Sequence, residues 1–112
     1  MERIPDLEEV SLELILHGGN ARAEAFEALK AAREGDFEKA QMHLKQSEEE
    51  IKVAHEAQTA MLQSDGEGAK TKADLLFVHA HGHLQTAMAE KGLIEEMVLL
   101  YKKLHKDYLR AR

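Results

Sequence analysis

The chain has 112 residues, a formal net charge of −6 and no cysteine. A chain of this length forms one domain, residues 1–112, with a hydrophobic core of its own. The missing cysteines exclude disulfides and thiolate nucleophiles. The acidic balance argues against a nucleic-acid partner and favours a protein partner with a basic surface. Because the sequence has no leader-like or long apolar segment, we expect a cytoplasmic protein without membrane insertion.

The first predicted helix begins near Asp6, which stands three residues before Glu9 in a pattern that caps helix N-termini. Apolar and small residues then recur every three or four positions as far as Ala32, which is one face of a helix. Gly18-Gly19-Asn20 interrupts this pattern, and a kink, a tight helix contact or a functional opening would each explain it. Gly35-Asp36 predicts the turn to a second helix, with a left-handed glycine followed by an N-cap.

The second predicted helix shows the same spacing over residues 37–61. Within it, we expect residues 47–50 to form a solvated face. Residues 64–68 are polar and glycine-rich, which predicts a loop. The third helix should run from about Lys70 to beyond Tyr101. Short connections force neighbouring helices to be antiparallel, so the sequence predicts an all-α, up-down-up three-helix bundle.

The third predicted helix carries two stripes of apolar or small residues. The first stripe consists of Ala73, Phe77, Ala80, Leu84, Ala87, Ile94, Val98 and Tyr101. The second, rotated by about a third of a turn, consists of Leu75, Val78, Gly82, Gln85, Ala89 and Gly92. One stripe is enough to cover the other two helices of the same chain. The second predicts contact with further copies around a symmetry axis, so we expect an oligomer.

Three of the seven histidines lie close together in the third helix. His79 and His83 are four residues apart and share a helix face, whereas His81 points away from both. Such a pair can bind a metal, act as a nucleophile with a supporting neighbour, or be two half-buried side chains without chemistry. A lone histidine nucleophile suits phosphoryl transfer, because neutral imidazole is available near pH 7. The donors that the phosphate then needs could come from His83, Thr86 or Gln58.

Several short segments, each weak alone, form a specific signature along nearly the whole chain. They are Leu16-His17-Gly18-Gly19-Asn20-Ala21-Arg22, Glu27-Ala28-Leu29-Lys30-Ala31-Ala32, Gly35-Asp36-Phe37 with Lys39-Ala40, Ala54-His55 with Gln58-Thr59, Val78-His79-Ala80, and Glu95-Glu96 before Leu100-Tyr101. In this order and spacing, they resemble the enzyme IIA component of the lactose/cellobiose/chitobiose class of the bacterial sugar phosphotransferase system.

The resemblance implies a homotrimer of three-helix subunits, with the third helices lining the three-fold axis. It implies that His79 takes a phosphoryl group from the phosphocarrier HPr and passes it to a cysteine of the IIB component, which phosphorylates a disaccharide during uptake. The chain would then be a phosphotransferase component that forms a phosphohistidine, with His83, Thr86 and Gln58 around the phosphate. Whether it counts as an enzyme is left open, and no cofactor is required.

One segment departs from the family pattern. The family reads His-Ala-Gln-Asp-His-Leu-Met-Thr where this chain has His79-Ala80-His81-Gly82-His83-Leu84-Gln85-Thr86. In the family, the aspartate meets its symmetry mates on the axis and binds a metal ion, but Gly82 has no side-chain ligand. The alternative function is therefore a divergent or engineered trimeric scaffold without phosphocarrier activity. It would bind a metal through His81 or His83 from three chains, or hold a small ligand on the axis.

Overall fold

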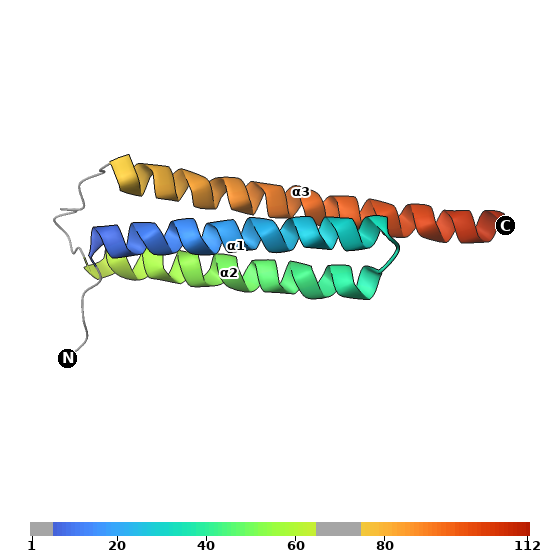
Figure 1. Ribbon diagram of the computed structural model, residues 1–112, viewed down its shortest axis with the longest axis horizontal. Coiled ribbons are helices and arrows are strands. Elements are labelled where there is room, and N and C mark those ends of the chain that lie inside the picture. The colour runs from blue at the N-terminus through green and yellow to red at the C-terminus, as the bar shows by residue number, and fades with distance from the viewer. Residues whose placement is uncertain (1–5, 65–74) are drawn as a thin grey trace.

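The structure is a computed structural model that describes residues 6–64 and 75–112. Within these ranges the chain forms three α-helices and no strand: α1 (Leu7–Arg33), α2 (Phe37–Ser64) and α3 (Leu75–Ala111). α1 and α3 run in the same direction and α2 runs against both (Figure 1). This arrangement confirms the predicted up-down-up bundle. The predicted start of the third helix and the predicted loop after Ser64 lie outside the described residues.

Local capping fixes where α1 begins and where it turns into α2. The Asp6 side chain accepts a hydrogen bond from the backbone N–H of Glu9 at 3.0 Å, as the N-cap of α1. Gly35 has a φ of +88°, a conformation that glycine adopts without steric cost. Asp36 Oδ1 accepts a hydrogen bond from the backbone N–H of Lys39 at 3.1 Å. Both caps and the left-handed glycine are therefore confirmed.

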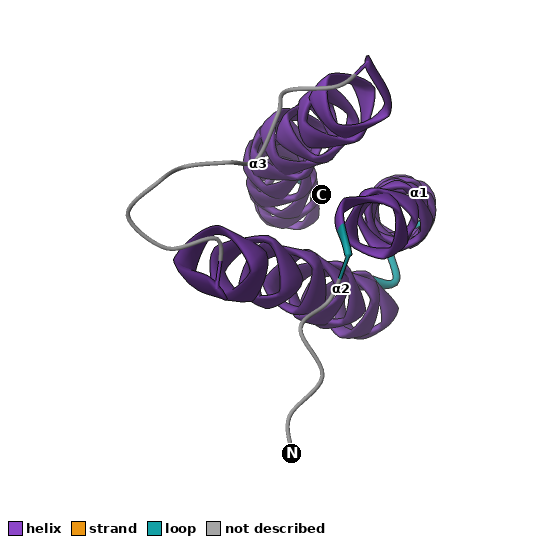
Figure 2. Cartoon of the chain, turned by 90° about the vertical axis from the view of Figure 1, so that its left-hand side faces the viewer, coloured by secondary structure: helices purple, strands orange, loops and turns teal. Residues whose placement is uncertain are grey.

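Small side chains dominate the core where α1 meets its neighbours. One buried cluster lies toward the α1–α2 turn and consists of Ala25, Ala28, Ala31, Ala32, Ala40, Leu44, Ile94 and Val98. The other consists of Val10, Leu14, Ala54, Met61, Ala80 and Leu84. Alanine lets helix axes approach closely, so α1 packs along both of its neighbours. α2 and α3 contact each other much less, and they diverge in the end-on view (Figure 2).

The two predicted stripes of α3 separate by burial. The first stripe faces α1 and α2, and Ala80, Leu84, Ala87, Ile94 and Val98 are buried; Ala73 lies outside the described residues. The second stripe is exposed along its whole length, with Leu75 at 89% and Val78 at 54%. In the part of the chain that the structure describes, no helix is long and apolar enough to cross a membrane.

The prediction that residues 47–50 form a solvated face is wrong at both ends of the segment. Ser47 is completely buried, and its hydroxyl donates to the backbone oxygen of Ala21 at 2.8 Å. Glu50 is half-buried against α1, whereas the two glutamates between them are exposed. The reason is helical geometry, because residues three apart lie on the same side of α2 and that side faces α1.

Candidate functional site: the histidine face of α3

Three of the predicted site residues lie on one side of α3. His79, His83 and Thr86 follow one another at spacings of four and three residues, which places them within about 60° of arc on a helix. His79 and Thr86 are exposed and His83 is half-buried. Within residues 6–64 and 75–112, no hydrogen bond or ion pair engages the His79 ring. The exposed side chain of His79 is therefore accessible from outside the chain.

The His83 ring packs against the glycine pair of α1. A Cβ atom placed on Gly18 would lie 2.9 Å from His83 Cδ2, and one placed on Gly19 would lie 3.8 Å from His83 Nε2. α1 continues through both glycines as regular helix, and Gly18 is buried. Of the three explanations that the sequence allowed for this triplet, the structure thus shows a tight helix contact.

His81 lies on the other side of α3 and faces α2. Its Nδ1 is 3.1 Å from the side-chain oxygen of Gln58. Because an amide oxygen can only accept, His81 donates this hydrogen bond through Nδ1. The Phe77 ring stacks on His81 with a centroid distance of 6.3 Å. Within one chain, Gln58 therefore contacts His81 and not His79.

Gly82 occupies an open position on the exposed stripe of α3. A Cβ atom placed there meets nothing within 4 Å. In the described part of the chain, no group of three His, Cys, Asp or Glu side chains is arranged to hold a metal ion. Since Gly82 also offers no side-chain donor, the residues present do not fit the metal ion that the family resemblance places at this position.

Polar contacts that sequence reasoning missed connect α1 to α2. Glu50 Oε1 lies 2.9 Å from His17 Nδ1 and accepts a hydrogen bond from Asn20 Nδ2 at 2.8 Å. The hydrogen bond with His17, followed by the one from Asn20, holds the pKa of Glu50 below its ordinary value. Further along, His43 Nδ1 lies 2.6 Å from Glu24 Oε2. These pairs fix how α1 and α2 lie along each other.

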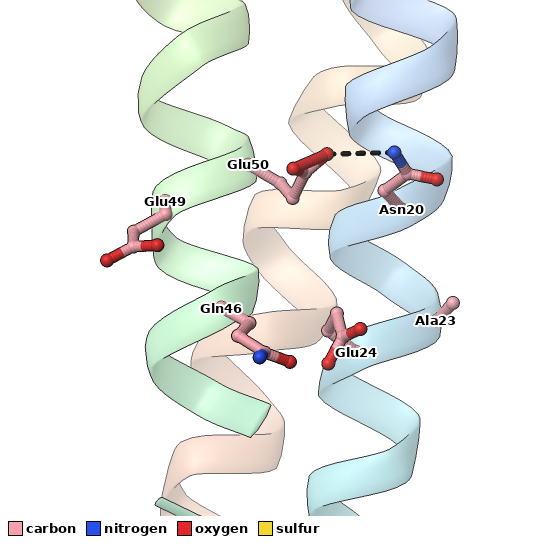
Figure 3. A pocket seen from close by; sticks show the side chains of 6 residues that line it. All are labelled: Asn20, Ala23, Glu24, Gln46, Glu49 and Glu50. Atoms are coloured by element: carbon pink, nitrogen blue, oxygen red, sulfur yellow. Dashed lines mark hydrogen bonds between the residues drawn. The ribbon is translucent and has the colours of Figure 1, made fainter. Parts of the chain in front are cut away.

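An acidic groove lies beside these pairs, between α1 and α2 (Figure 3). Its volume is about 360 Å³, and its lining consists of Asn20, Ala23, Glu24, Gln46, Glu49 and Glu50. The hydrogen bond between Asn20 and Glu50 crosses it, as Figure 3 shows. The groove is therefore part of the α1–α2 contact and is separate from the histidine face of α3.

An ion pair connects α1 to α3 beyond His83. Arg22 Nε lies 2.6 Å from Glu90 Oε1, and Arg22 Nη2 donates to Glu90 Oε2 at 3.2 Å. Glu90 lies seven residues, or about two helical turns, after His83 on the same side of α3. The glycine pair and this ion pair together hold the histidine face of α3 against α1.

Comparison with known proteins identifies the family of the chain. Residues 9–102 match the family model described as "PTS system, Lactose/Cellobiose specific IIA subunit". The chain is also 42% identical over 99 residues to the lichenan-specific phosphotransferase enzyme IIA component of Bacillus subtilis (strain 168), an alignment that covers 88% of this chain and 90% of that protein. The chain belongs to the lactose/cellobiose-specific IIA family. The resemblance inferred from the sequence is thereby confirmed.

Further relatives extend the likeness of this IIA chain over almost its full length. It is 40% identical over 111 residues to the N,N'-diacetylchitobiose-specific EIIA component of Escherichia coli (strain K12), covering 93% of this chain and 96% of that one. The crystal structure of the cellobiose-specific enzyme IIA from Bacillus anthracis superposes with a TM-score of 0.84 at 38% identity, over 93% of this chain and 95% of that one. A solution structure of an IIA(chitobiose)–HPr complex superposes with a TM-score of 0.80 at 40% identity, covering 90% and 98%.

Proposed function

We propose that this IIA chain is a phosphocarrier of a sugar phosphotransferase system. His79 accepts a phosphoryl group from HPr and passes it to a IIB component, which uses it in disaccharide uptake. The observation that carries the proposal is the exposed His79, whose ring makes no hydrogen bond or ion pair among the described residues, in a chain of the IIA family. A similar IIA protein has been solved in complex with HPr, which supports the choice of partner.

Phosphoryl transfer by this route needs a nucleophile and hydrogen-bond donors that stabilise the phosphoryl group. A ring nitrogen of His79 attacks the phosphorus atom, the new N–P bond forms, and the bond to the donor side chain of HPr breaks, with its electron pair leaving on HPr. The transferred group carries negative charge, which hydrogen-bond donors stabilise. The His83 ring N–H and the Thr86 hydroxyl are the donors that share the side of α3 with His79. In the second step, the acceptor cysteine of the IIB component attacks the phosphorus atom, and the N–P bond to His79 breaks with its electron pair returning to the imidazole.

The protein acts in this proposal as a cytoplasmic homotrimer of single-domain subunits, residues 1–112. The exposed second stripe of α3 supports assembly, because an apolar and small-residue face of this length is covered most economically by copies of itself. No cofactor takes part in the transfer. Gly82 offers no ligand, so nothing in the proposal depends on a metal ion on the axis.

Intact-mass spectrometry tests the proposal directly. The protein is incubated with phosphoenolpyruvate, enzyme I and HPr, and its mass is measured at mildly alkaline pH, where phosphohistidine survives. We expect one acid-labile phosphoryl increment in the parent protein and none in His79→Gln. His105→Gln is the control, because His105 is an exposed histidine far along the same helix, where its ring lies tilted against the Phe37 ring.

Two outcomes would overturn the assignment. A phosphoryl increment that persists in His79→Gln would place the acceptor on another residue. No increment in the well-folded parent protein would favour the alternative function as a trimeric scaffold. In that case, metal analysis of protein purified without a histidine tag would decide whether His81 or His83 binds a metal.

A further inference from the structure

We propose that Gly18 is a positioning residue for the phosphoryl site: by lacking a side chain, it leaves a slot in α1 that fixes the ring of His83 beside His79. The proposal rests on the phosphocarrier function proposed above and adds a residue on a second helix to it. Gly18 does not touch the phosphoryl group itself. It acts through His83, because it determines where the His83 ring lies.

The distances define the slot. A Cβ atom on Gly18 would lie 2.9 Å from Cδ2 and 3.5 Å from Nε2 of His83, and 3.7 Å from the Cα of Leu84. Carbon atoms that are not bonded to each other have their optimal separation at about 3.5–4.0 Å, so a contact of 2.9 Å is repulsive. Leu84 is 1% exposed and belongs to the core, which holds the α3 backbone in place. A side chain at Gly18 would therefore displace the His83 ring and leave the helix where it is.

The neighbouring glycine does not have this role. A Cβ atom on Gly19 would lie 3.8 Å from His83 Nε2, which is an ordinary van der Waals contact. Gly18 and Gly19 stand in the same stretch of α1, and each lowers the helix propensity of α1 relative to alanine. The two positions therefore form a pair with the same helix-propensity cost, and they differ in burial and in the room that is left for the imidazole.

The orientation of the ring links the slot to the chemistry. The Cδ2–Nε2 edge of His83 lies against the glycines of α1. Nδ1 is on the opposite edge of an imidazole, so it is the nitrogen that points away from α1 and remains to serve the phosphoryl group. A donor held in one place before the reaction stabilises developing charge without having to be ordered during it. A misplacement of about 1 Å at such a donor can slow a reaction by up to about a hundredfold.

The experiment compares Gly18→Ala with Gly19→Ala by two readouts. The first is the ¹H–¹³C NMR spectrum of the His83 ring, and the second is the rate of phosphoryl transfer from phosphorylated HPr. We expect Gly18→Ala to shift the Cδ2–H resonance of His83 and to slow transfer about tenfold. Gly19→Ala should leave the resonance in place and the rate within about twofold of the parent.

A double variant shows whether the effect passes through His83. His83→Ala empties the slot, so adding Gly18→Ala to it should slow transfer no further than His83→Ala does alone. If Gly18→Ala by itself does not fold, the double variant with His83→Ala should restore the fold. A double variant that stays unfolded would overturn the proposal, because the clash would then involve something other than this ring.

Two other results would overturn the proposal that Gly18 positions the His83 ring. One is an equal response of Gly18→Ala and Gly19→Ala in the spectrum and in the rate. The other is a rate loss from Gly18→Ala that persists when His83 is absent. Failure of the phosphocarrier proposal is a separate result, seen as a parent protein that accepts no phosphate. The NMR comparison needs no phosphoryl donor, and it decides the position of His83 in that case as well.

Discussion

Replacing Gly82 by alanine should stabilise the fold, whereas the same replacement at Gly35 should destabilise it. Gly82 lies inside α3, and a Cβ atom there meets nothing within 4 Å. Since glycine in a helix interior costs about 1 kcal/mol relative to alanine, Gly82→Ala should raise the free energy of unfolding by about that amount. Gly35 has a φ of +88°. That conformation costs a residue with a Cβ atom about 1–2 kcal/mol, so the two variants should differ by about 2–3 kcal/mol.

Urea unfolding followed by the helical circular dichroism signal measures both changes, and it should be repeated at several protein concentrations. Gly35→Asn is the control, because asparagine tolerates the left-handed conformation better than alanine and should cost less. A Gly82→Ala variant that is destabilised to the same extent at every protein concentration would refute the reasoning. A loss that depends on protein concentration would mean instead that a neighbouring copy of the proposed trimer fills the space that is open in the single chain. Equal costs for Gly35→Ala and Gly35→Asn would refute the argument from the positive φ.

Three further predictions concern the contacts of α1 and α2. Leu14 is fully buried and Leu12 is 53% exposed. Leu14→Ala should therefore lower the free energy of unfolding by about 3 kcal/mol, and Leu12→Ala should lower it by less than about 1 kcal/mol. Urea titrations that show similar losses for the two variants would contradict this difference in burial. The hydrogen bond with His17 keeps the pKa of Glu50 below its ordinary value of 4.5. Its stabilising effect is therefore present above that value and is lost as the pH falls through the lowered pKa. Thermal melts from about pH 3 to pH 6 should show a weaker acid dependence in Glu50→Gln, and an unchanged profile would refute this. Ser47→Ala removes a buried hydrogen bond to the Ala21 carbonyl of α1, so it should lower the free energy of unfolding by about 1 kcal/mol. A urea midpoint equal to that of the parent protein would contradict this prediction.

The features of the fold that were predictable from the sequence are those that depend on residues close together in the chain. A cap such as Asp6 needs only a backbone N–H three residues away, and the turn at Gly35-Asp36 involves two adjacent residues. The spacing of small and apolar residues within α3 was sufficient to separate the buried stripe from the exposed one. The resemblance to the IIA family came from another source, the order and spacing of short segments such as Val78-His79-Ala80 along the chain.

The contacts between helices could not be predicted in the same way. Spacing within one helix shows which residues share a face, but not which residue of the next helix lies opposite. His17 and Glu50 are 33 positions apart, and nothing local indicates that they meet. For the same reason, Gln58 could be assigned to the phosphoryl site from the sequence, although in the folded chain it contacts His81. The glycine pair was visible as an interruption, but its purpose depends on His83, which lies on another helix.

The row of polar contacts between α1 and α2 determines how these two helices can move relative to each other. These contacts join His17 to Glu50, Ala21 to Ser47 and Glu24 to His43, so seven residues along α1 are matched by seven residues in the opposite direction along α2. A shift of one helix along the other by a single turn would break all three of these contacts at once. These hydrogen bonds thus fix the position of α2 along α1. α3 packs mainly on α1 and contacts α2 much less. Because α3 packs mainly on α1, we expect that a partner or a label bound to the far side of α2 would leave His79, the proposed phosphate acceptor, in place.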